Sequence, residues 1–92
     1  MLFAVHCLDK PNALDVRLAN RPAHLDFAKS FLDQILIGGP LLSDDGNGMI
    51  GSLFVVDFPD HAACVAKFAT DPYAVAGLFQ SVTITPYRKV FP

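Results

Sequence analysis

His24 and Asp71 are the side chains of this sequence that together can carry out acid–base chemistry. A carboxylate bonded to one imidazole nitrogen fixes the tautomer of the ring and leaves the other nitrogen basic towards a substrate. The sequence has no GxSxG motif, and no serine or cysteine stands out as a nucleophile, so the pair is only part of a hydrolytic triad. Such a dyad suits proton transfer, elimination or isomerisation better than acyl transfer.

Each member of this pair also has a simpler interpretation when taken alone. Asp71 precedes Pro72, and an aspartate in that place is a common N-cap of a helix. His24 falls in the first turn of a helix that the sequence predicts to begin at Asn20, where a solvated side chain is expected. The positive end of the helix dipole there disfavours a protonated imidazole. Only the fold decides whether the two residues meet.

Four further residues are candidate substrate contacts. Arg17 and Arg21 lie just upstream of His24, and their guanidinium groups offer paired donors to an anionic substrate; the alternative is ordinary surface charge. Tyr73 follows Asp71 closely and either walls a pocket or packs in the core. His6 lies in an apolar segment, where a hydrogen-bonded core histidine is more common than a ligand-binding one.

Two other motifs do not carry the chemistry that they resemble. Gly46–Gly51 matches GxGxxG, but that fingerprint must follow a strand and open a helix, and here a strand follows. Asp44 and Asp45 resemble the start of a calcium loop, yet all nine acidic residues are aspartate and the final glutamate ligand is missing. We interpret the segment as a solvated hairpin turn. The three histidines show no metal-ligand spacing, so we expect no metal and no cofactor.

Charge and composition exclude several classes of protein. The net charge is −2 and the seven Lys and Arg residues are dispersed, so the basic footprint of a nucleic-acid-binding protein is missing. No apolar run is long enough to cross a membrane, and the first residues lack the basic start of a signal peptide. Cys7 and Cys64 have no CxxC spacing, which favours two reduced thiols in a cytoplasmic protein.

The elements that must position these residues follow from hydrophobic periodicity and turn signals. We expect a single domain over residues 1–92. Its predicted elements are a strand at 2–8, a short helical stretch at 13–19, an amphipathic helix from Asn20 to a break at 38–40, a strand beginning at 40–42, a turn at 43–48, a strand at 50–58, a helix opening at 59–60, a short helix at 71–77 and a strand at 82–85.

The predicted order, β-α-β-β-α-β, is that of an α+β, ferredoxin-like fold. Its four-stranded sheet carries helices on one face and leaves the other face bare. The chain is 52% hydrophobic and only 17% charged, and a domain of this size buries its apolar surface incompletely. We therefore expect the strands at 2–8, 50–58 and 82–85 to carry side chains that are buried only in a homodimer formed through the open sheet face.

Several stretches, in this order and spacing, resemble the YciI-like (YCII-related) family. They are Arg21–Leu25, Gly39-Pro40, Asp71–Tyr73 with Gly77, and Pro86–Phe91, and the opening Cys7–Lys10 and Arg17 fit as well. The resemblance spans nearly the whole chain. One departure is mild, because Tyr87 stands where the family usually has Phe.

The resemblance implies a dimeric α+β barrel in which two ferredoxin-like subunits pack sheet to sheet. It also implies a His–Asp pair in a cleft, proposed to be catalytic in the family, which falls on His24 and Asp71. One branch of the family removes chloride from a chlorinated hydroxyquinol.

The leading hypothesis is a cofactor-independent enzyme that acts on a small, cyclic or aromatic, anionic metabolite. Two alternatives stay open. The chain is a non-catalytic small-molecule-binding module or accessory subunit whose ligand depends on Arg17, Arg21 or Tyr73, or it is a dimeric remnant in which Asp71 is a simple cap.

Overall fold

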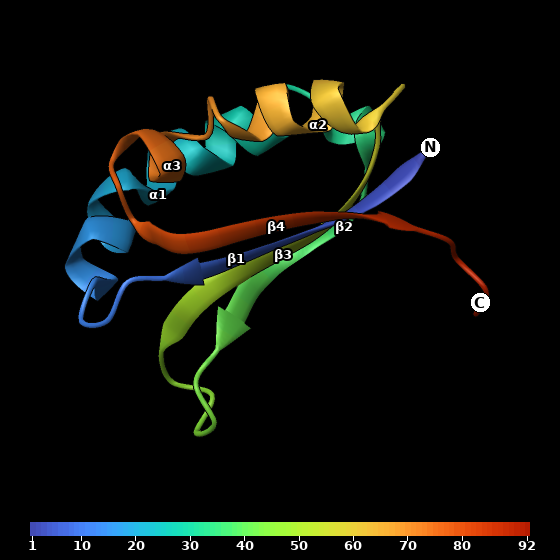
Figure 1. Cartoon of the computed structure of the whole chain (residues 1–92). Helices are drawn as coiled ribbons and strands as arrows, with labels where there is room; N and C mark the ends of the chain where they lie inside the picture. Colours follow the sequence, from blue (N-terminus) through green and yellow to red (C-terminus); the bar gives the residue numbers. More distant parts are fainter.

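One antiparallel sheet, covered by helices on a single face, forms the molecule in the computed structural model, which describes all 92 residues (Figure 1). The sheet has the order β2-β3-β1-β4, and every neighbouring pair is antiparallel. The predicted α+β, ferredoxin-like order is therefore confirmed. The elements are β1 Leu2–Asp9, α1 Leu14–Lys29, a 3₁₀ turn Leu32–Gln34, β2 Ile35–Leu42, β3 Met49–Asp57, α2 His61–Phe68, α3 Pro72–Val75 and β4 Phe79–Tyr87.

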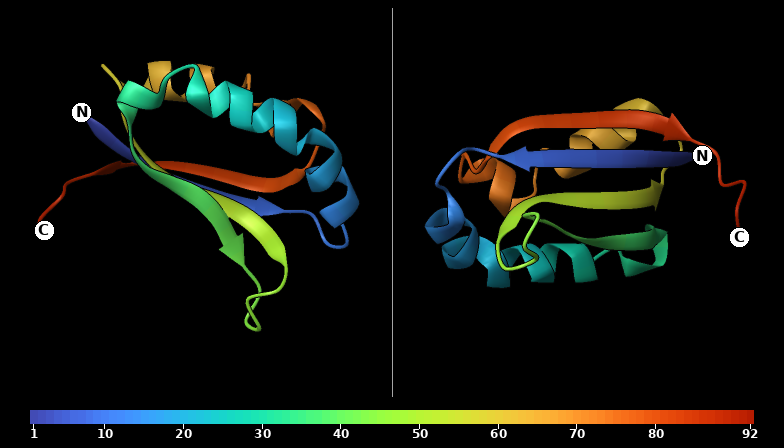
Figure 2. Two further views of the ribbon diagram at one scale, coloured as in Figure 1. Left: turned by 180° about the vertical axis from the view of Figure 1, so that it is seen from behind. Right: turned by 90° about the horizontal axis from the view of Figure 1, so that it is seen from below.

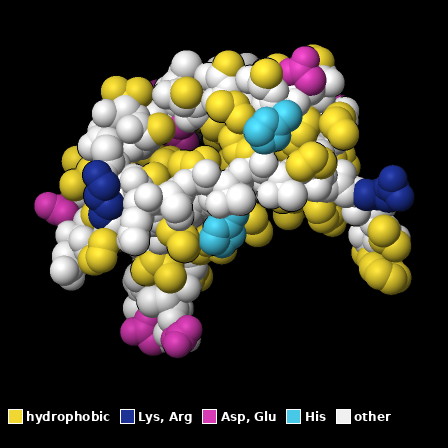
Figure 3. All heavy atoms as spheres, in the orientation of Figure 1, with side chains coloured by type: hydrophobic (Ala, Val, Ile, Leu, Met, Phe, Trp, Pro, Cys, Tyr) yellow, Lys and Arg dark blue, Asp and Glu magenta, His cyan; other side chains and the backbone are white.

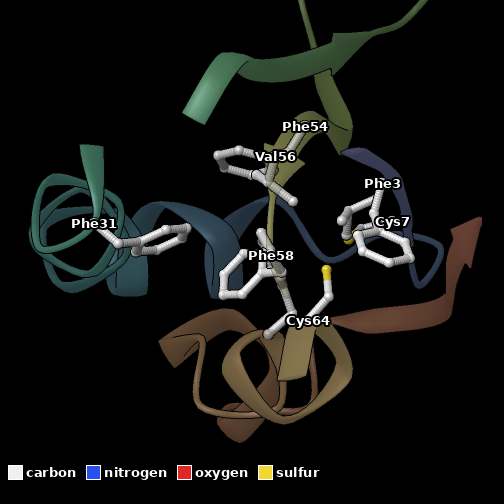
Figure 4. Close-up of a cluster of buried hydrophobic side chains, with 9 residues drawn as sticks. Phe3, Cys7, Phe31, Phe54, Val56, Phe58 and Cys64 are labelled. Carbon is white, nitrogen blue, oxygen red and sulfur yellow. The ribbon is translucent and has the colours of Figure 1, made fainter. Parts of the chain in front are cut away.

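The core lies between the sheet and the helices and is rich in phenylalanine. On β1, Phe3, Val5 and Cys7 point towards the helices and are at most 1% exposed, as the period-2 alternation of a half-buried strand requires. Phenylalanines from β3, from α2 and from the connecting segments meet these strand residues (Figure 4), and Phe27 of α1 packs against this cluster. This packing fixes the distance between the helices and the sheet.

The long helix differs from the prediction at its start. It begins at Leu14, so the expected break at Asn20 is wrong, and Pro22 lies inside a continuous helix. Asn20 is not a cap, since its Nδ2 donates to the carbonyl of Val16 at 2.9 Å. His24 therefore lies in the third turn, far from the positive end of the helix dipole, and the dipole argument does not apply to it.

The same helix also ends earlier than expected. It stops at Lys29, and Ile35 and Leu36 belong to β2 rather than to the helix. Residues 38–40 therefore lie within a strand and do not break a helix. Because β2 is an edge strand, it tolerates Pro40, whose missing N–H need not serve a second neighbour.

The remaining elements follow the prediction closely. β3 spans nearly the predicted range, and β4 is longer than the predicted 82–85. Asp60 caps α2 and Asp71 caps α3 through side-chain oxygens. β3 begins at Met49, inside Gly46–Gly51, and no helix opens there, which confirms that this stretch is not a dinucleotide fingerprint. No helix is both long enough and apolar enough to cross a membrane.

The second face of the sheet carries no helix (Figure 2). Ile37, Val55 and Leu53 lie on this face, next to Leu8 and His6. Ile37 is 58% exposed and Leu8 is 39% exposed. His6 is exposed as well, so the expectation of a buried core histidine is wrong. We call this surface the open face.

Candidate active site

His24 and Asp71 meet in the structure. His24 Nδ1 lies 2.9 Å from Asp71 Oδ1, and the two residues are 7% and 1% exposed. The contact arises because α1 carries His24 on its buried side and α3, which begins directly after Asp71, packs against α1. The solvated position expected for His24 alone is therefore wrong.

Asp71 has two roles at once. Its Oδ1 accepts a hydrogen bond from the backbone N–H of Tyr73 at 2.9 Å, which caps α3, and also contacts His24 Nδ1. An ionised carboxylate only accepts hydrogen bonds, so Nδ1 of His24 carries the proton and donates it. In the neutral ring, Nε2 is then the basic nitrogen.

Nε2 of His24 faces an accessible space. Every fully buried side-chain nitrogen or oxygen has a hydrogen-bond partner. The imidazole forms its hydrogen bond through Nδ1 and none through Nε2. Nε2 is therefore in contact with solvent. His24 lines a cleft of about 110 Å³ between α1 and the edge strand β2. The other lining residues come from α1, β2 and β3 and are Arg17, Arg21, Leu25, Ala28, Gly38, Gly39, Pro40, Met49 and Phe54.

A larger hollow of about 420 Å³ lies elsewhere, between the helix layer and β4 (Figure 3). Its lining is mainly apolar, and its histidine, His61, bonds the carbonyl of Ile84 at 2.9 Å. It holds no carboxylate and no acid–base pair. The smaller cleft beside His24 is therefore the candidate active site.

Arg17 is buried and paired with a carboxylate, so the interpretation of it as surface charge is wrong. Its Nε and Nη2 donate to the two carboxylate oxygens of Asp9 at 2.7 and 2.8 Å, and Nη2 also donates to Ser52 at 3.0 Å. Burial opposes the charge, but the hydrogen bonds and the negative charge of Asp9 outweigh burial and raise the pKa of Arg17. This cation therefore stays charged at every physiological pH.

Tyr73 lies against both Arg17 and His24. Its ring stacks on the imidazole with centroids 3.9 Å apart and planes 13° apart, and Cζ of Arg17 lies 4.5 Å from the centre of the same ring. Burial raises the pKa of the Tyr73 phenol, although the charges of Arg17 and Arg21 oppose this shift. Tyr73 is 1% exposed and does not line the cleft.

The other candidates are placed differently. Arg21 is exposed at the mouth of the cleft and forms no ion pair. His6 lies on the open face, across the sheet from His24. The structure thus brings Arg17, His24, Asp71 and Tyr73 together, with Arg21 at the rim, and leaves His6 outside.

Three residues near the site were not found from the sequence. Asp9 anchors Arg17, Ser52 completes that bond set, and the ring of Phe54 lies 6.0 Å from the imidazole, edge to face. Asp9 had a signal, since it ends β1 as the chain turns towards the helix of Arg17. Nothing in the local sequence marks Ser52.

Neither cysteine is suited to act as a nucleophile here. Burial and the charge of Asp71 raise the pKa of Cys7 to about 12, and burial raises the pKa of Cys64 to about 11. Both thiols are free and buried. No group of three or more His, Cys, Asp or Glu side chains is placed to hold a metal ion.

Comparison with known proteins gives the family of the chain. The model of the YCII-related domain matches residues 1–88. The chain is 35% identical over 98 residues to Protein YciI of Escherichia coli, covering 99% of this chain and the whole of that protein. It has the same identity and coverage with an uncharacterised protein of Haemophilus influenzae.

Solved structures show the same architecture. The chain is similar to 5-chloro-2-hydroxyhydroquinone dehydrochlorinase (TftG) of Burkholderia phenoliruptrix, solved in complex with 2,5-dihydroxybenzoquinone, with a TM-score of 0.89, 29% identity and coverage of 96% of this chain and 94% of that one. It shares the fold of an antibiotic biosynthesis monooxygenase at a TM-score of 0.53, 17% identity and coverage of 97% and 100%. The matching family model and the relatives, which agree with the resemblance carried by the sequence motifs, show that this chain belongs to the YCII-related domain family.

Proposed function

We propose that the protein is a cofactor-independent enzyme that uses His24 and Asp71 as a general acid–base pair on a small, cyclic or aromatic, anionic substrate. The observation that carries the proposal is the buried 2.9 Å contact between the two side chains beside an accessible cleft. The likeness to a dehydrochlorinase of 29% identity supports an elimination or a related proton transfer.

Each residue has a defined part in this reaction. Nε2 of His24 removes a proton from the substrate, while Asp71 holds Nδ1–H and stabilises the positive charge that develops on the ring. In an elimination the electron pair of the broken C–H bond forms the new double bond, and the leaving group departs with the electron pair of its own bond to carbon. In an isomerisation, Nε2 returns the proton to a different atom. Arg21, the unpaired cation at the cleft mouth, binds the negative charge of the substrate.

The size of the cleft supports a small substrate. It encloses about 110 Å³, less than the roughly 150 Å³ of an engineered apolar cavity that binds benzene. A single ring therefore fills the cleft and extends partly out of it, towards Arg21.

The test is turnover of small hydroxylated quinols, with 5-chloro-2-hydroxyhydroquinone as the first compound and chloride release as the readout. General acid–base catalysis contributes about 10²–10⁴-fold in rate, so we expect His24→Ala to lose about that much. His61→Ala is the matched control, because that ring lies in the other hollow. Equal turnover by His24→Ala and wild type would exclude the mechanism.

The rival proposal is a non-catalytic binding module that uses the same cleft. It gains support if 2,5-dihydroxybenzoquinone binds with an affinity that depends on Arg21 while no compound is turned over. Isothermal titration with wild type and Arg21→Gln measures that dependence.

The proposal also includes a homodimer formed through the open face, with the two sheets packed against each other. The apolar side chains on that face support it, since Ile37 is 58% exposed and Leu8 is 39% exposed. Two free, buried thiols are in keeping with a cytoplasmic location.

A further inference from the structure

We propose that Arg17 and Tyr73 are positioning residues of the His24–Asp71 pair and not substrate contacts. Arg17 fixes the ring of Tyr73, and Tyr73 in turn fixes both the plane of the imidazole and the orientation of the carboxylate. The inference rests on the proposed function, because positioning matters only if the pair reacts.

The first step is that two of the three guanidinium nitrogens of Arg17 are already occupied. Three hydrogen bonds, two to Asp9 and one to Ser52, use its Nε and Nη2, and only 2% of the residue is exposed. The planar guanidinium in a two-point pair with a carboxylate has a single orientation. Asp9 already neutralises the charge of this cation, whereas Arg21 at the cleft mouth has no competing acid.

The second step is the position of the Tyr73 ring. Arg17 and His24 are seven residues apart on α1, which is about 10.5 Å along the helix axis. The Tyr73 ring lies 4.5 Å from Cζ of Arg17 and 3.9 Å from the imidazole centroid. The ring therefore fills the space between these two side chains, with the cation on one face and the imidazole on the other.

The third step is that Tyr73 contacts both members of the pair. Its ring is nearly parallel to the imidazole, 13° apart, and its backbone N–H donates to the oxygen of Asp71 that also meets His24 Nδ1. Rotation of an imidazole about its last torsion has only broad minima. The stack removes that freedom and keeps Nδ1 aimed at Asp71 and Nε2 at the cleft.

The cost of the arrangement supports a positioning role. Burying an ion pair such as Arg17–Asp9 requires desolvation of both charges, and the attraction between them offsets this cost only in part. In a small domain, the benefit of such a pair is the fixed orientation of its side chains. The cation above the ring adds a modest attraction.

The experiment measures the tautomer of His24 by ¹⁵N NMR of its ring nitrogens, without any substrate. We expect wild type to hold the proton on Nδ1, and Tyr73→Phe to keep that state because the aromatic ring remains. In Tyr73→Leu the ring is lost, and we expect ¹⁵N shifts averaged over both tautomers. Tyr87→Leu, a change of the only other tyrosine, is the matched control and keeps the wild-type shifts.

Arg17→Lys tests the contact between Arg17 and the Tyr73 ring, and it remains informative if Tyr73→Leu fails to fold. It keeps the charge but loses the two-point pair, so we expect part of the same averaging. A single Nδ1–H tautomer in both folded Tyr73→Leu and Arg17→Lys would overturn the proposal.

Where a turned-over substrate is known, the kinetic parameters separate the roles. A positioning role lowers kcat by about 10–10²-fold in Tyr73→Leu and leaves KM unchanged, whereas a substrate contact raises KM. A raised KM with unchanged kcat in Arg17→Lys would assign Arg17 to substrate binding and overturn the proposal. If the proposed function fails, no variant or wild type shows turnover, yet the NMR result still decides the positioning.

Discussion

Oδ1 of Asp71 is the atom on which the candidate site depends, because it accepts from the backbone of Tyr73 and meets the ring of His24. The first contact caps the start of α3 and the second orients an imidazole. A carboxylate does both, but only the second contact needs its negative charge. The two roles are therefore separable by substitution.

Asp71→Asn separates them. Asparagine caps helices about as well as aspartate, so we expect the melting temperature to change little. The amide lacks the charge that stabilises a protonated imidazole, and turnover falls by about 10²–10⁴-fold. Thermal unfolding and turnover, measured on the same sample, check the prediction.

Asp71→Ala is the companion variant, because it loses the cap as well, at a cost of about 1 kcal/mol. If Asp71→Asn leaves ligand binding unchanged and neither the variant nor wild type turns over a substrate, Asp71 is a simple cap and the chain is a non-catalytic remnant.

At the scale of single residues, the sequence predicted which residues form the site better than it predicted what surrounds them. His24 and Asp71 were found because an imidazole and a carboxylate suggest a dyad. The burial of Arg17 was not found, since its partners Asp9 and Ser52 lie on two different strands. Long-range pairs of this kind leave no local pattern in a single sequence.

Among the elements, β2 shapes the cleft through a glycine pair. A Cβ on Gly38 would lie 2.6 Å from two ring carbons of Phe54, whereas a Cβ on Gly39 would meet nothing within 4 Å. Phe54 lies edge to face with His24 and lines the cleft. The absence of a side chain at Gly38 thus allows the Phe54 ring to occupy its place beside the imidazole.

Gly38→Ala and Gly39→Ala form a matched pair for testing this contact. We expect Gly38→Ala to lower the free energy of unfolding by about 1–3 kcal/mol through overpacking, and Gly39→Ala to leave it unchanged or slightly raise it. Urea unfolding measures both.

The double variant Gly38→Ala/Phe54→Leu is the control, because the smaller side chain relieves the clash and recovers stability. Equal stabilities of the two single alanine variants would contradict the proposed contact.

The element boundaries show where sequence periodicity is insufficient. Ile35 and Leu36 continue the three- and four-residue spacing of the helix, yet they begin β2, where Ile35 pairs with Val56. Asn20 and Pro22 look like a helix start, yet α1 runs through them. In each case tertiary packing overrides local propensity, whereas the order of the elements along the chain and the cap at Asp71 followed from local signals.

At the scale of the whole molecule, the open face is the surface on which the proposed homodimer depends. Contacts among the strands and helices leave Ile37 and Leu8 largely exposed on one side of the sheet. Exposed apolar area that is grouped on one face is typical of a subunit interface. In the proposed homodimer, a second copy covers this face in a two-fold arrangement that uses the same surface twice.

Ile37→Lys tests this assembly without touching the core. We expect wild type to sediment as a dimer at micromolar concentration and Ile37→Lys to shift towards the monomer, because each dimer would bury two added charges. Val75→Lys is the control, since Val75 is 76% exposed on the helix layer. Analytical ultracentrifugation provides the masses, and a wild-type monomer would rule out the dimer.

The ion pair between Arg17 and Asp9 determines the stage of folding at which the site can form. Its members and neighbours come from β1, α1, β3 and α3, so no fragment of the chain contains the whole cluster. The His24 imidazole acquires its orientation only when the sheet has formed and α3 has docked. We therefore expect the site to form in the same cooperative step as the fold, and the backbone amide of Tyr73 to exchange with deuterium as slowly as the amides of the central strands.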